Sequence, residues 1–395
     1  MDFVIIANSW EAGIANPTSK HHIARQLALK GNRVLWVTGA GMRRPSLGSG
    51  TDRSRIFRKL VASLRAPRLA ETTTSDSGGV WVLSPLLIPL PSVGWVRRLN
   101  GWIYSVCAGL WARRLNFRNP VMINYVPVLA HAMRRWKGVK VYHCVDRWDA
   151  FEMYDSALMS EMDSACCRYA DLVITSAGDL YDRCKEKAAN VHLVMHGVDH
   201  SNFATALDQP PRPDDLPAGS IIGFFGLLSE WFDQSLVLAL ARALPDTHVV
   251  LIGDADVDVD ALRGQPNIHL LGARRFAELP RYIAHFAIGI IPFVVNELTF
   301  AVNPVKLREM MAAGCPVVST ALPEVERYAG TASLAKGERG GVRVVADEIE
   351  FFEAVRNWLE APATLSERET ISKHVAAETW EAKTGEILHL IEALT

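Results

Sequence analysis

The segment Asn303–Glu309 combines a cationic and an acidic residue at helical spacing, directly after a buried strand. The apolar run Ile288–Phe293 predicts that strand, and Pro304 favours the first turn of a following helix. Unpaired amides and the helix dipole attract anions to such an N-terminus. Lys306 could therefore neutralise a diphosphate, and Glu309, on the same face, could accept hydrogen bonds from ribose hydroxyls. A capped surface helix with a solvated Lys and Glu is the alternative.

A second candidate is the segment Tyr142–Asp149, where a strand ends and two aspartates follow. The carboxyl edge of a parallel sheet is where α/β proteins bind ligands. A carboxylate there can take the proton of an attacking hydroxyl, so Asp146 is a candidate general base. The alternative is that Asp146 caps a helix, although we favour Asp149 for the cap because a helical pattern follows it.

The elements that must position these groups alternate between strand and helix along the chain. Short β-branched runs such as Phe3–Ala7 and Ile221–Phe225 are separated by amphipathic segments such as Ser19–Lys30 and Gln234–Leu244. This alternation predicts parallel sheets covered by helices on both faces. Residues 208–220 hold four prolines and no periodicity, which indicates a linker.

Length and composition are consistent with that organisation. A chain of 395 residues, 49% hydrophobic and 22% charged, suits two or three soluble domains. The net charge of −1 gives no indication of nucleic acid binding. None of the six cysteines lies in a CxxC pair, which favours a reducing cytosol. We find neither a signal peptide nor a stretch long enough to span a membrane.

Several segments together resemble glycosyltransferases with the two-domain GT-B fold, in particular the family 4-like and xanthan-type glucuronosyltransferase groups. The segment Asn303–Thr320 is similar to their donor-site signature. Further similarities are His196-Gly-Val-Asp-His200, Ile222–Gly226, Val249–Gly253 and Asn267–Pro280. The resemblance implies two Rossmann-like domains facing a cleft, with an acceptor domain over residues 1–200, a donor domain over 201–375 and a C-terminal helix, 376–395, packing on the first domain.

The resemblance also implies which residues meet the two substrates. On the donor side we expect Gly226, Glu230, His196, Arg274, Asn303, Lys306 and Glu309. On the acceptor side we expect Trp10, Ser19 and His21 from the loop after the first strand. Ser19 could instead cap the next helix, and His21 or His22 could be an alternative base. The competing interpretations are simple structural roles. His196 would then be a hinge residue, and Arg274 would be a solvated loop arginine.

One departure from the family pattern concerns the mechanism. Retaining family 4 enzymes carry two glutamates eight positions apart, but Ala301 stands where the first would precede Glu309. Lys306 and Asp146 are similar to the phosphate-binding lysine and catalytic aspartate of the xanthan-type enzymes, which invert. We therefore expect inversion with Asp146 as base. A retaining transferase, a sugar epimerase and a non-catalytic partner subunit remain alternatives, whereas the absence of GxGxxG after the first strand argues against a dinucleotide oxidoreductase.

The segment 86–118 interleaves aromatic residues with arginines. Residues 43–118 hold 13 Lys and Arg against 3 Asp and Glu. Such a pattern is typical of a segment at a lipid headgroup interface, although aromatics packed on a sheet would also explain it. The expected protein is thus a cytoplasmic glycosyltransferase, peripheral on the inner face of the membrane, acting on a lipid-linked oligosaccharide or polysaccharide precursor. We expect a nucleotide-sugar donor, with UDP favoured, and neither a cofactor nor a metal, since Asp254 and Asp256 read as a solvated loop.

Overall fold

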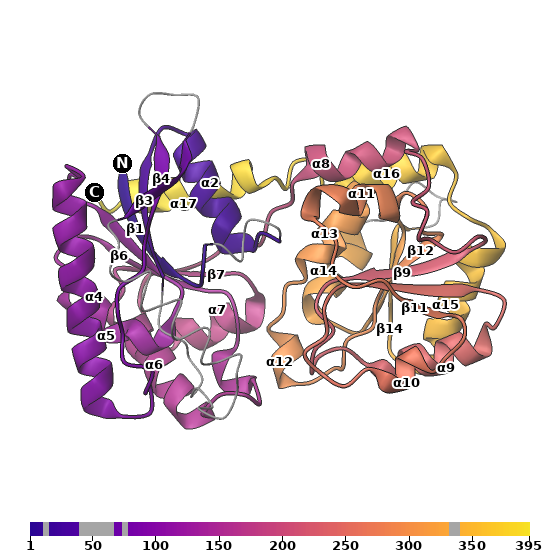
Figure 1. Ribbon diagram of the computed structural model, residues 1–395, viewed down its shortest axis with the longest axis horizontal. Coiled ribbons are helices and arrows are strands. Elements are labelled where there is room, and N and C mark those ends of the chain that lie inside the picture. Colours follow the sequence, from indigo (N-terminus) through magenta and orange to yellow (C-terminus); the bar gives the residue numbers. More distant parts are fainter. Residues whose placement is uncertain (11–15, 39–66, 73–77, 332–339) are drawn as a thin grey trace. The chain divides into compact units, whose positions relative to one another are not determined.

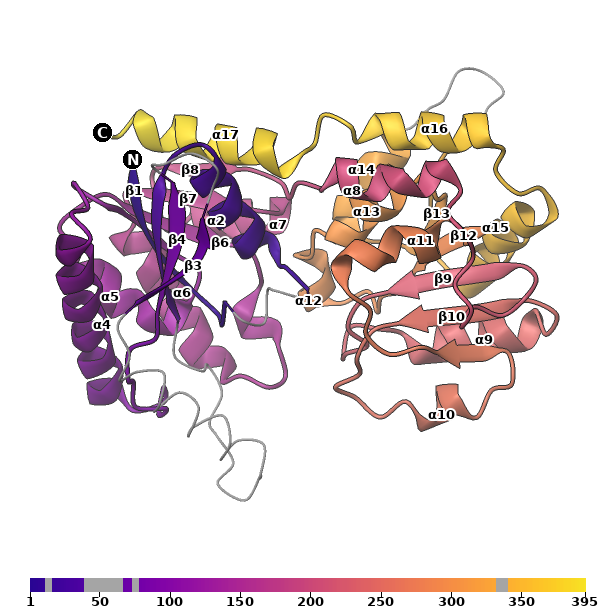
Figure 2. The same cartoon turned by 45° about the horizontal axis from the view of Figure 1, so that its top comes forward.

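The computed structural model describes residues 1–10, 16–38, 67–72, 78–331 and 340–395. The chain forms two compact units (Figures 1 and 2). The first unit contains Met1–Met195 and Lys383–Thr395, and the second contains His196–Ala382. The chain changes units after Met195 and again after Ala382, so its last residues belong to the first unit.

The first unit is built on an eight-stranded sheet with the order β3-β4-β2-β1-β5-β6-β7-β8. All described pairings are parallel except β3 with β4. The central strands are buried on both faces, which explains their unbroken apolar sequences. The strands are β1 (Asp2–Ala7), β2 (Arg33–Thr38), β3 (Arg68–Thr72), β4 (Gly79–Leu83), β5 (Val121–Asn124), β6 (Lys140–Cys144), β7 (Leu172–Thr175) and β8 (Val191–Leu193).

Helices cover both faces of this sheet, as right-handed crossovers on either side of β1 require. Helices α4, α5 and α6 lie side by side on one face, and α2 covers the other (Figures 1 and 2). The helices are α2 (Ser19–Leu29), α4 (Gly94–Arg114), η1 (Pro127–Leu129), α5 (Ala130–Arg135), η2 (Trp148–Ala150), α6 (Ser156–Tyr169), α7 (Gly178–Lys185) and α17 (Trp380–Glu392), which starts in the second unit.

The second unit has a six-stranded parallel sheet with the order β11-β10-β9-β12-β13-β14. The strands are β9 (Ile221–Phe225), β10 (His248–Ile252), β11 (Ile268–Leu270), β12 (Ile288–Ile291), β13 (Val317–Thr320) and β14 (Val342–Val345). The helices are α8 (His200–Ala204), η3 (Thr205–Asp208), α9 (Gln234–Ala243), α10 (Asp260–Arg263), η4 (Phe276–Glu278), α11 (Leu279–Ile283), α12 (Glu297–Phe300), α13 (Val305–Ala312), α14 (Pro323–Thr331), α15 (Glu348–Glu360) and α16 (Leu365–His374).

The proline-rich segment 208–220 is not the connection between the units, which corrects the prediction from its composition. It lies inside the second unit. The side chain of Arg281 donates to the carbonyl of Pro211 at 2.8 Å, and the His285 ring lies 3.0 Å from the carbonyl of Pro210. Prolines lack an amide donor but keep their carbonyls, so the segment is held by side chains that reach its backbone.

Candidate active site

Lys306 and Glu309 lie on α13, whose N-cap is Pro304. The ammonium of Lys306 is 5.0 Å from the ring centroid of Phe224 and 4.7 Å from that of Phe293. Both rings come from the segments at the carboxyl ends of neighbouring strands, so they hold the cation over the edge of the sheet. The structure therefore places the predicted diphosphate and ribose contacts on one short helix beside that edge.

Burial shifts both ionisable groups toward neutrality. It lowers the pKa of Lys306 to about 8, an effect that the charge of Glu309 opposes. It raises the pKa of Glu309 to about 7, with Lys306 acting in the opposite direction and Asp199 adding to the rise. A half-buried cation and a buried carboxylate with pKa values shifted toward neutral pH are typical of binding and catalytic sites. The interpretation of Lys306 and Glu309 as a solvated pair is therefore wrong.

Gly226 directly follows β9 and lies against the side chain of Lys306. Its φ is +132°, and a Cβ there would lie 2.9 Å from Cε and 3.0 Å from Nζ of Lys306. Gly253 directly follows the next strand, β10, and a Cβ there would lie 1.9 Å from the carbonyl oxygen of Gly226. At Gly226 the backbone conformation favours glycine. At Gly253 the close approach of a second backbone requires it.

Asn303 contacts a residue that the sequence did not single out. The Asn303 side-chain oxygen accepts a hydrogen bond from Arg308 at 2.5 Å, and Arg308 also donates to Glu378 at 2.8 Å. Arg308 is fully buried, and Tyr328 donates to the same carboxylate of Glu378. This network fixes the loop before α13. Arg308 looks like a surface residue in the sequence, and only tertiary contacts reveal it.

His196 opens the second unit, at the predicted crossover. Its ring packs at 5.9 Å on Trp380, and the following backbone pairs with the chain before α17, since Val198 donates to the carbonyl of Glu378 at 2.8 Å. Asp199 then caps α8, accepting from the amide of Asn202 at 3.2 Å. The crossover motif therefore joins two chain segments and places the Asp199 charge near Glu309.

Arg274 and Glu230 are the remaining donor-side predictions. The guanidinium of Arg274 donates to Asp215 at 2.5 Å and to the hydroxyl of Tyr282 at 2.9 Å. These partners give Arg274 a structural role in holding the 208–220 segment, which differs from the solvated loop arginine of the competing interpretation. Glu230 is half-buried in the turn between β9 and α9.

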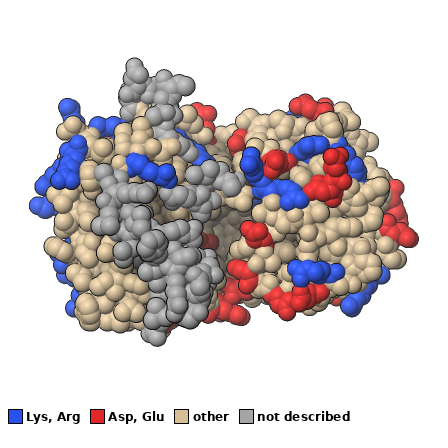
Figure 3. Space-filling model, viewed as in Figure 1, with Lys and Arg blue, Asp and Glu red and all other residues tan. Residues whose placement is uncertain are grey.

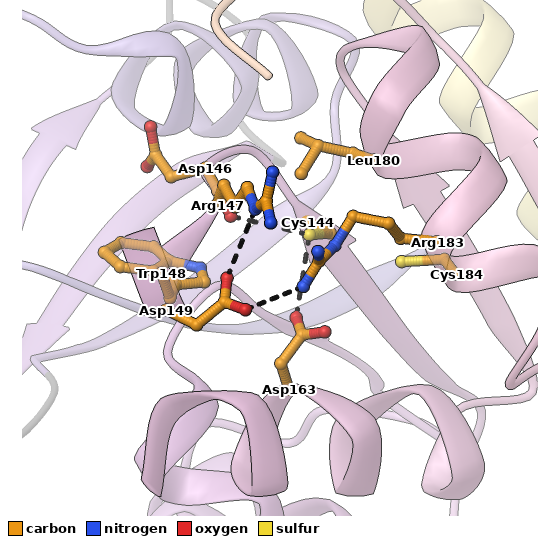
Figure 4. Close-up of a pocket in the computed structure, with 9 residues that line it drawn as sticks. All are labelled: Cys144, Asp146, Arg147, Trp148, Asp149, Asp163, Leu180, Arg183 and Cys184. Atoms are coloured by element: carbon orange, nitrogen blue, oxygen red, sulfur yellow. Dashed lines mark hydrogen bonds and ion pairs between the residues drawn. The ribbon is translucent and has the colours of Figure 1, made fainter. Parts of the chain in front are cut away.

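In the first unit, Asp146 follows β6 at the carboxyl edge of the sheet. It caps no described helix, because the N-cap of η2 is Arg147 and that of α6 is Asp155. Asp149 is not a cap either, contrary to our prediction. It accepts from Arg183 at 2.8 Å and lines a pocket with Asp146 and Arg147 (Figure 4). The Asp146 carboxylate points away from that ion pair (Figure 4).

Asp146 shares its surroundings with a lysine from a distant part of the chain. The ammonium of Lys20, on the first turn of α2, lies 5.3 Å from the ring centroid of Trp148 and 5.8 Å from that of Tyr125. Burial raises the pKa of Asp146 and lowers that of Lys20, and the attraction between the two charges opposes both shifts. Next to them, His143 is buried and lies 3.0 Å from the Tyr125 hydroxyl.

The acceptor-side predictions for Trp10 and His21 need correction, because both side chains belong to the core. The His21 ring packs at 4.8 Å on Trp36, with Nδ1 2.8 Å from the Thr18 hydroxyl and Nε2 3.2 Å from the Ser9 carbonyl. Both ring nitrogens are occupied, and burial lowers the pKa of His21 to about 4. His21 therefore supports the start of α2. Thr18 is the N-cap residue, and Ser19 is the first residue of the helix.

The segment 86–118 forms the long helix α4 and its flanks. Its inner row, Val96, Asn100, Tyr104, Ala108 and Ala112, is buried. Its outer row is exposed and apolar, with Trp95 64%, Trp102 48% and Leu110 49% accessible. No helix among the described residues has the length and apolar character needed to cross a membrane. Figure 3 shows Lys and Arg along the edge of the first unit where Figure 1 places α4.

Comparisons with known proteins agree with this architecture. Residues 219–361, within the second unit, match the sequence profile of the family described as glycosyl transferases group 1. A curated relative is a glycosyltransferase assigned to teichuronic acid biosynthesis, TuaH of Bacillus subtilis (strain 168), which is 29% identical over 216 residues. That match covers 50% of this chain and 54% of the relative, so the chain spans about half of the relative's length.

Solved structures match the entire chain. A sucrose-phosphate synthase from Thermosynechococcus elongatus superposes with a TM-score of 0.68 at 15% identity, covering 99% of each chain. The Anabaena protein HepE in complex with UDP superposes with a TM-score of 0.63 at 14% identity, covering 100% of each chain. The α/β fold with two parallel-sheet domains and the predicted resemblance to GT-B glycosyltransferases are therefore confirmed.

Proposed function

We propose that this protein is a glycosyltransferase that moves a sugar from a nucleoside diphosphate sugar, with UDP favoured, to an acceptor hydroxyl. The observation that carries the proposal is half-buried Lys306 and buried Glu309 on one helix beside Gly226, inside the region that matches the glycosyl transferase family. A half-buried ammonium suits a diphosphate, and a buried carboxylate three residues along suits ribose hydroxyls. No metal or cofactor enters the proposal.

The first experiment is a panel of nucleotide sugars, read by thermal shift and by release of nucleoside diphosphate. Stabilisation by UDP-sugars above the other nucleotides, followed by UDP release with an acceptor, is the expected result. Binding without any diphosphate release in the presence of membrane extract as acceptor source would instead favour a non-catalytic subunit.

For the chemistry, we propose inverting transfer with Asp146 as general base. Its carboxylate is partly buried, which raises its pKa and so increases its basicity. The Asp146→Asn variant should lose at least about 100-fold in kcat, the contribution typical of a general base, while binding UDP as the wild type does. Transfer at the normal rate by this variant would refute the assignment. The anomeric configuration of the product, read by NMR, separates inversion from retention.

For the acceptor, we propose a lipid-linked oligosaccharide or polysaccharide precursor, met at the cytoplasmic face of a membrane through α4. The argument is charge complementarity. Helix α4 contains four arginines and no acidic residue, and its exposed Arg98, Arg113 and Arg114 flank the apolar outer row. Arginine beside exposed Trp suits an anionic lipid headgroup layer.

Flotation with liposomes tests this surface. The protein should float with vesicles of phosphatidylglycerol and phosphatidylcholine but much less with phosphatidylcholine alone. The double variant Trp95→Glu, Trp102→Glu should stay at the bottom of the gradient. Ile349→Glu, at a 72% exposed position on α15 in the second unit, is the matched control. Unchanged flotation of the double variant, or dimerisation of the wild type through α4, would count against a lipid surface.

A further inference from the structure

The loop that carries Asp146 follows β6 and has little regular structure. Between Val145 and Ala150 it contains the single turn η2, in which the amide of Ala150 donates to the carbonyl of Arg147 at 3.0 Å. Turns of this 3₁₀ type have poorer hydrogen-bond geometry than an α-helix. The orientation of the Asp146 side chain therefore depends on contacts that neighbouring segments make with the loop.

The segment from β7 to α7 supplies two such contacts. The hydroxyl of Ser176, directly after β7, donates to the carbonyl of Val145 at 3.3 Å. Arg183 then reaches from α7 and donates to the carboxylate of Asp149 at 2.8 Å (Figure 4). These contacts lie on either side of Asp146 in the sequence, so the loop is held both before and after this residue.

The contact between Arg183 and Asp149 is sheltered from solvent. The two side chains are 28% and 18% exposed. Arg147 brings a second cation to the other oxygen of the same carboxylate, at 3.7 Å. A charge-assisted hydrogen bond in such a place is stronger than an ion pair at the surface, which contributes little. The contact can therefore restrain the loop, as a solvated ion pair would not.

A second carboxylate, that of Asp163, lines the same pocket but has partners of its own. It accepts a hydrogen bond from the Tyr142 hydroxyl at 2.6 Å, and it lies 3.6 Å from the ammonium of Lys187. The carboxylate of Asp146 points away from the contact between Arg183 and Asp149 (Figure 4). Arg183 therefore holds the loop through Asp149 and does not occupy the carboxylate of Asp146.

We propose that Arg183 is a positioning residue for Asp146: its guanidinium holds Asp149 and so fixes the loop after β6, which keeps the Asp146 carboxylate in one orientation. This inference rests on the proposed role of Asp146 as the base. In that role the carboxylate takes the proton of the acceptor hydroxyl as the hydroxyl oxygen bonds to the anomeric carbon and the nucleoside diphosphate leaves.

The test is a double-mutant cycle with Arg183→Met, Asp149→Asn and the double variant, read by release of UDP from a UDP-sugar with membrane extract as acceptor source. Each single variant should lose on the order of tenfold in kcat, because a misplaced base slows the transfer. KM for the donor should not change, since the donor residues lie in the second unit. The double variant should lose no more than the weaker single variant, because both substitutions break one contact. Additive losses would overturn the proposal.

Hydrogen exchange separates this role from a general loss of stability and from the proposed function. In Arg183→Met the amide of Ala150 should exchange about tenfold faster, whereas exchange in β1 and β5 should not change. Arg168→Met, at an exposed position on α6, is the matched control and should behave as the wild type. Unchanged exchange at Ala150, or equal acceleration throughout the first unit, overturns the role of Arg183. Normal transfer by Asp146→Asn overturns the base instead, and exchange at Ala150 still decides whether Arg183 holds the loop.

Discussion

Lys306 and Glu309 lie one helical turn apart, and their environment matters more than their identity. A solvated lysine stays charged up to about pH 10 and a solvated glutamate down to about pH 4. Burial beneath the sheet edge brings their pKa values to about 8 and about 7. The charged form of each is therefore held at an energetic disadvantage until a ligand compensates it. A diphosphate and a pair of ribose hydroxyls are such compensating partners.

This arrangement predicts a pH optimum for UDP binding. As the pH rises through about 8, Lys306 loses its proton and its attraction for the diphosphate, so affinity should fall. As the pH falls through about 7, Glu309 gains a proton and loses acceptor capacity, so affinity should fall again. Isothermal titration calorimetry between pH 6 and 9.5 measures both limbs.

Lys306→Met should weaken UDP binding by about 10- to 100-fold at neutral pH, the usual effect of losing a charged hydrogen-bond donor. It should also flatten the alkaline limb. Lys373→Met, at an exposed position on α16, is the control and should leave both unchanged. An alkaline limb that persists in Lys306→Met would mean that another group senses the pH.

Among the elements, the carboxyl ends of β9 and β10 determine how closely a ligand can approach the backbone of the second unit. A Cβ at Gly226 would meet the side chain of Lys306, and a Cβ at Gly253 would meet the backbone of Gly226. Gly226→Ala adds a methyl group at a φ of +132° and 2.9 Å from Lys306 Cε. The strain should lower the free energy of unfolding of the second unit by about 1–3 kcal/mol. Displacement of Lys306 should in addition weaken UDP binding by the folded protein.

The control for this substitution is Gly264→Ala. Gly264 has no left-handed φ, and its new methyl group would meet only ordinary contacts from 3.5 Å. Urea unfolding followed in parallel with UDP titration separates the two effects. Wild-type affinity in Gly226→Ala would show that the methyl group is accommodated and that glycine is not required for binding.

How far the sequence predicts these elements depends on how local their cause is. Strands such as Ile221–Phe225 and His248–Ile252 match the structure because buried parallel strands carry continuous apolar runs. The edge strand Arg68–Thr72 was missed because its polar composition carries no such signal. Helix α16 was also missed, although its Thr364-x-x-Glu367 capping box was readable in the sequence.

The same limit applies to the site. Lys306 and Glu309 were predicted because three positions on one helix bring them together without any knowledge of the fold. Lys20 beside Asp146 and Arg308 beside Glu378 depend on long-range packing that no local pattern encodes. The misassigned His21 illustrates the reverse error, because a histidine in a polar-looking loop proved to be buried against Trp36.

At the scale of the whole molecule, the last residues of the chain complete the first unit although they follow the second in sequence. On α17, Ile387 and Ile391 are buried, at 1% and 0% accessible. Their burial extends the core of a unit whose other residues end at Met195. The stability of the first unit should therefore depend on a segment that follows the second unit in the sequence, whereas the stability of the second unit should not depend on it.

Ile391→Ala tests this dependence. Removing a buried Ile side chain costs about 2–5 kcal/mol, and the loss should appear as faster hydrogen exchange in the first-unit sheet. Exchange in β9 and β10, and the affinity for UDP, should stay as in the wild type. Leu394→Ala, at a 38% exposed position near the same end, is the matched control and should change little. Faster exchange spread equally over both sheets would show instead that the two units unfold together and that α17 couples their stabilities.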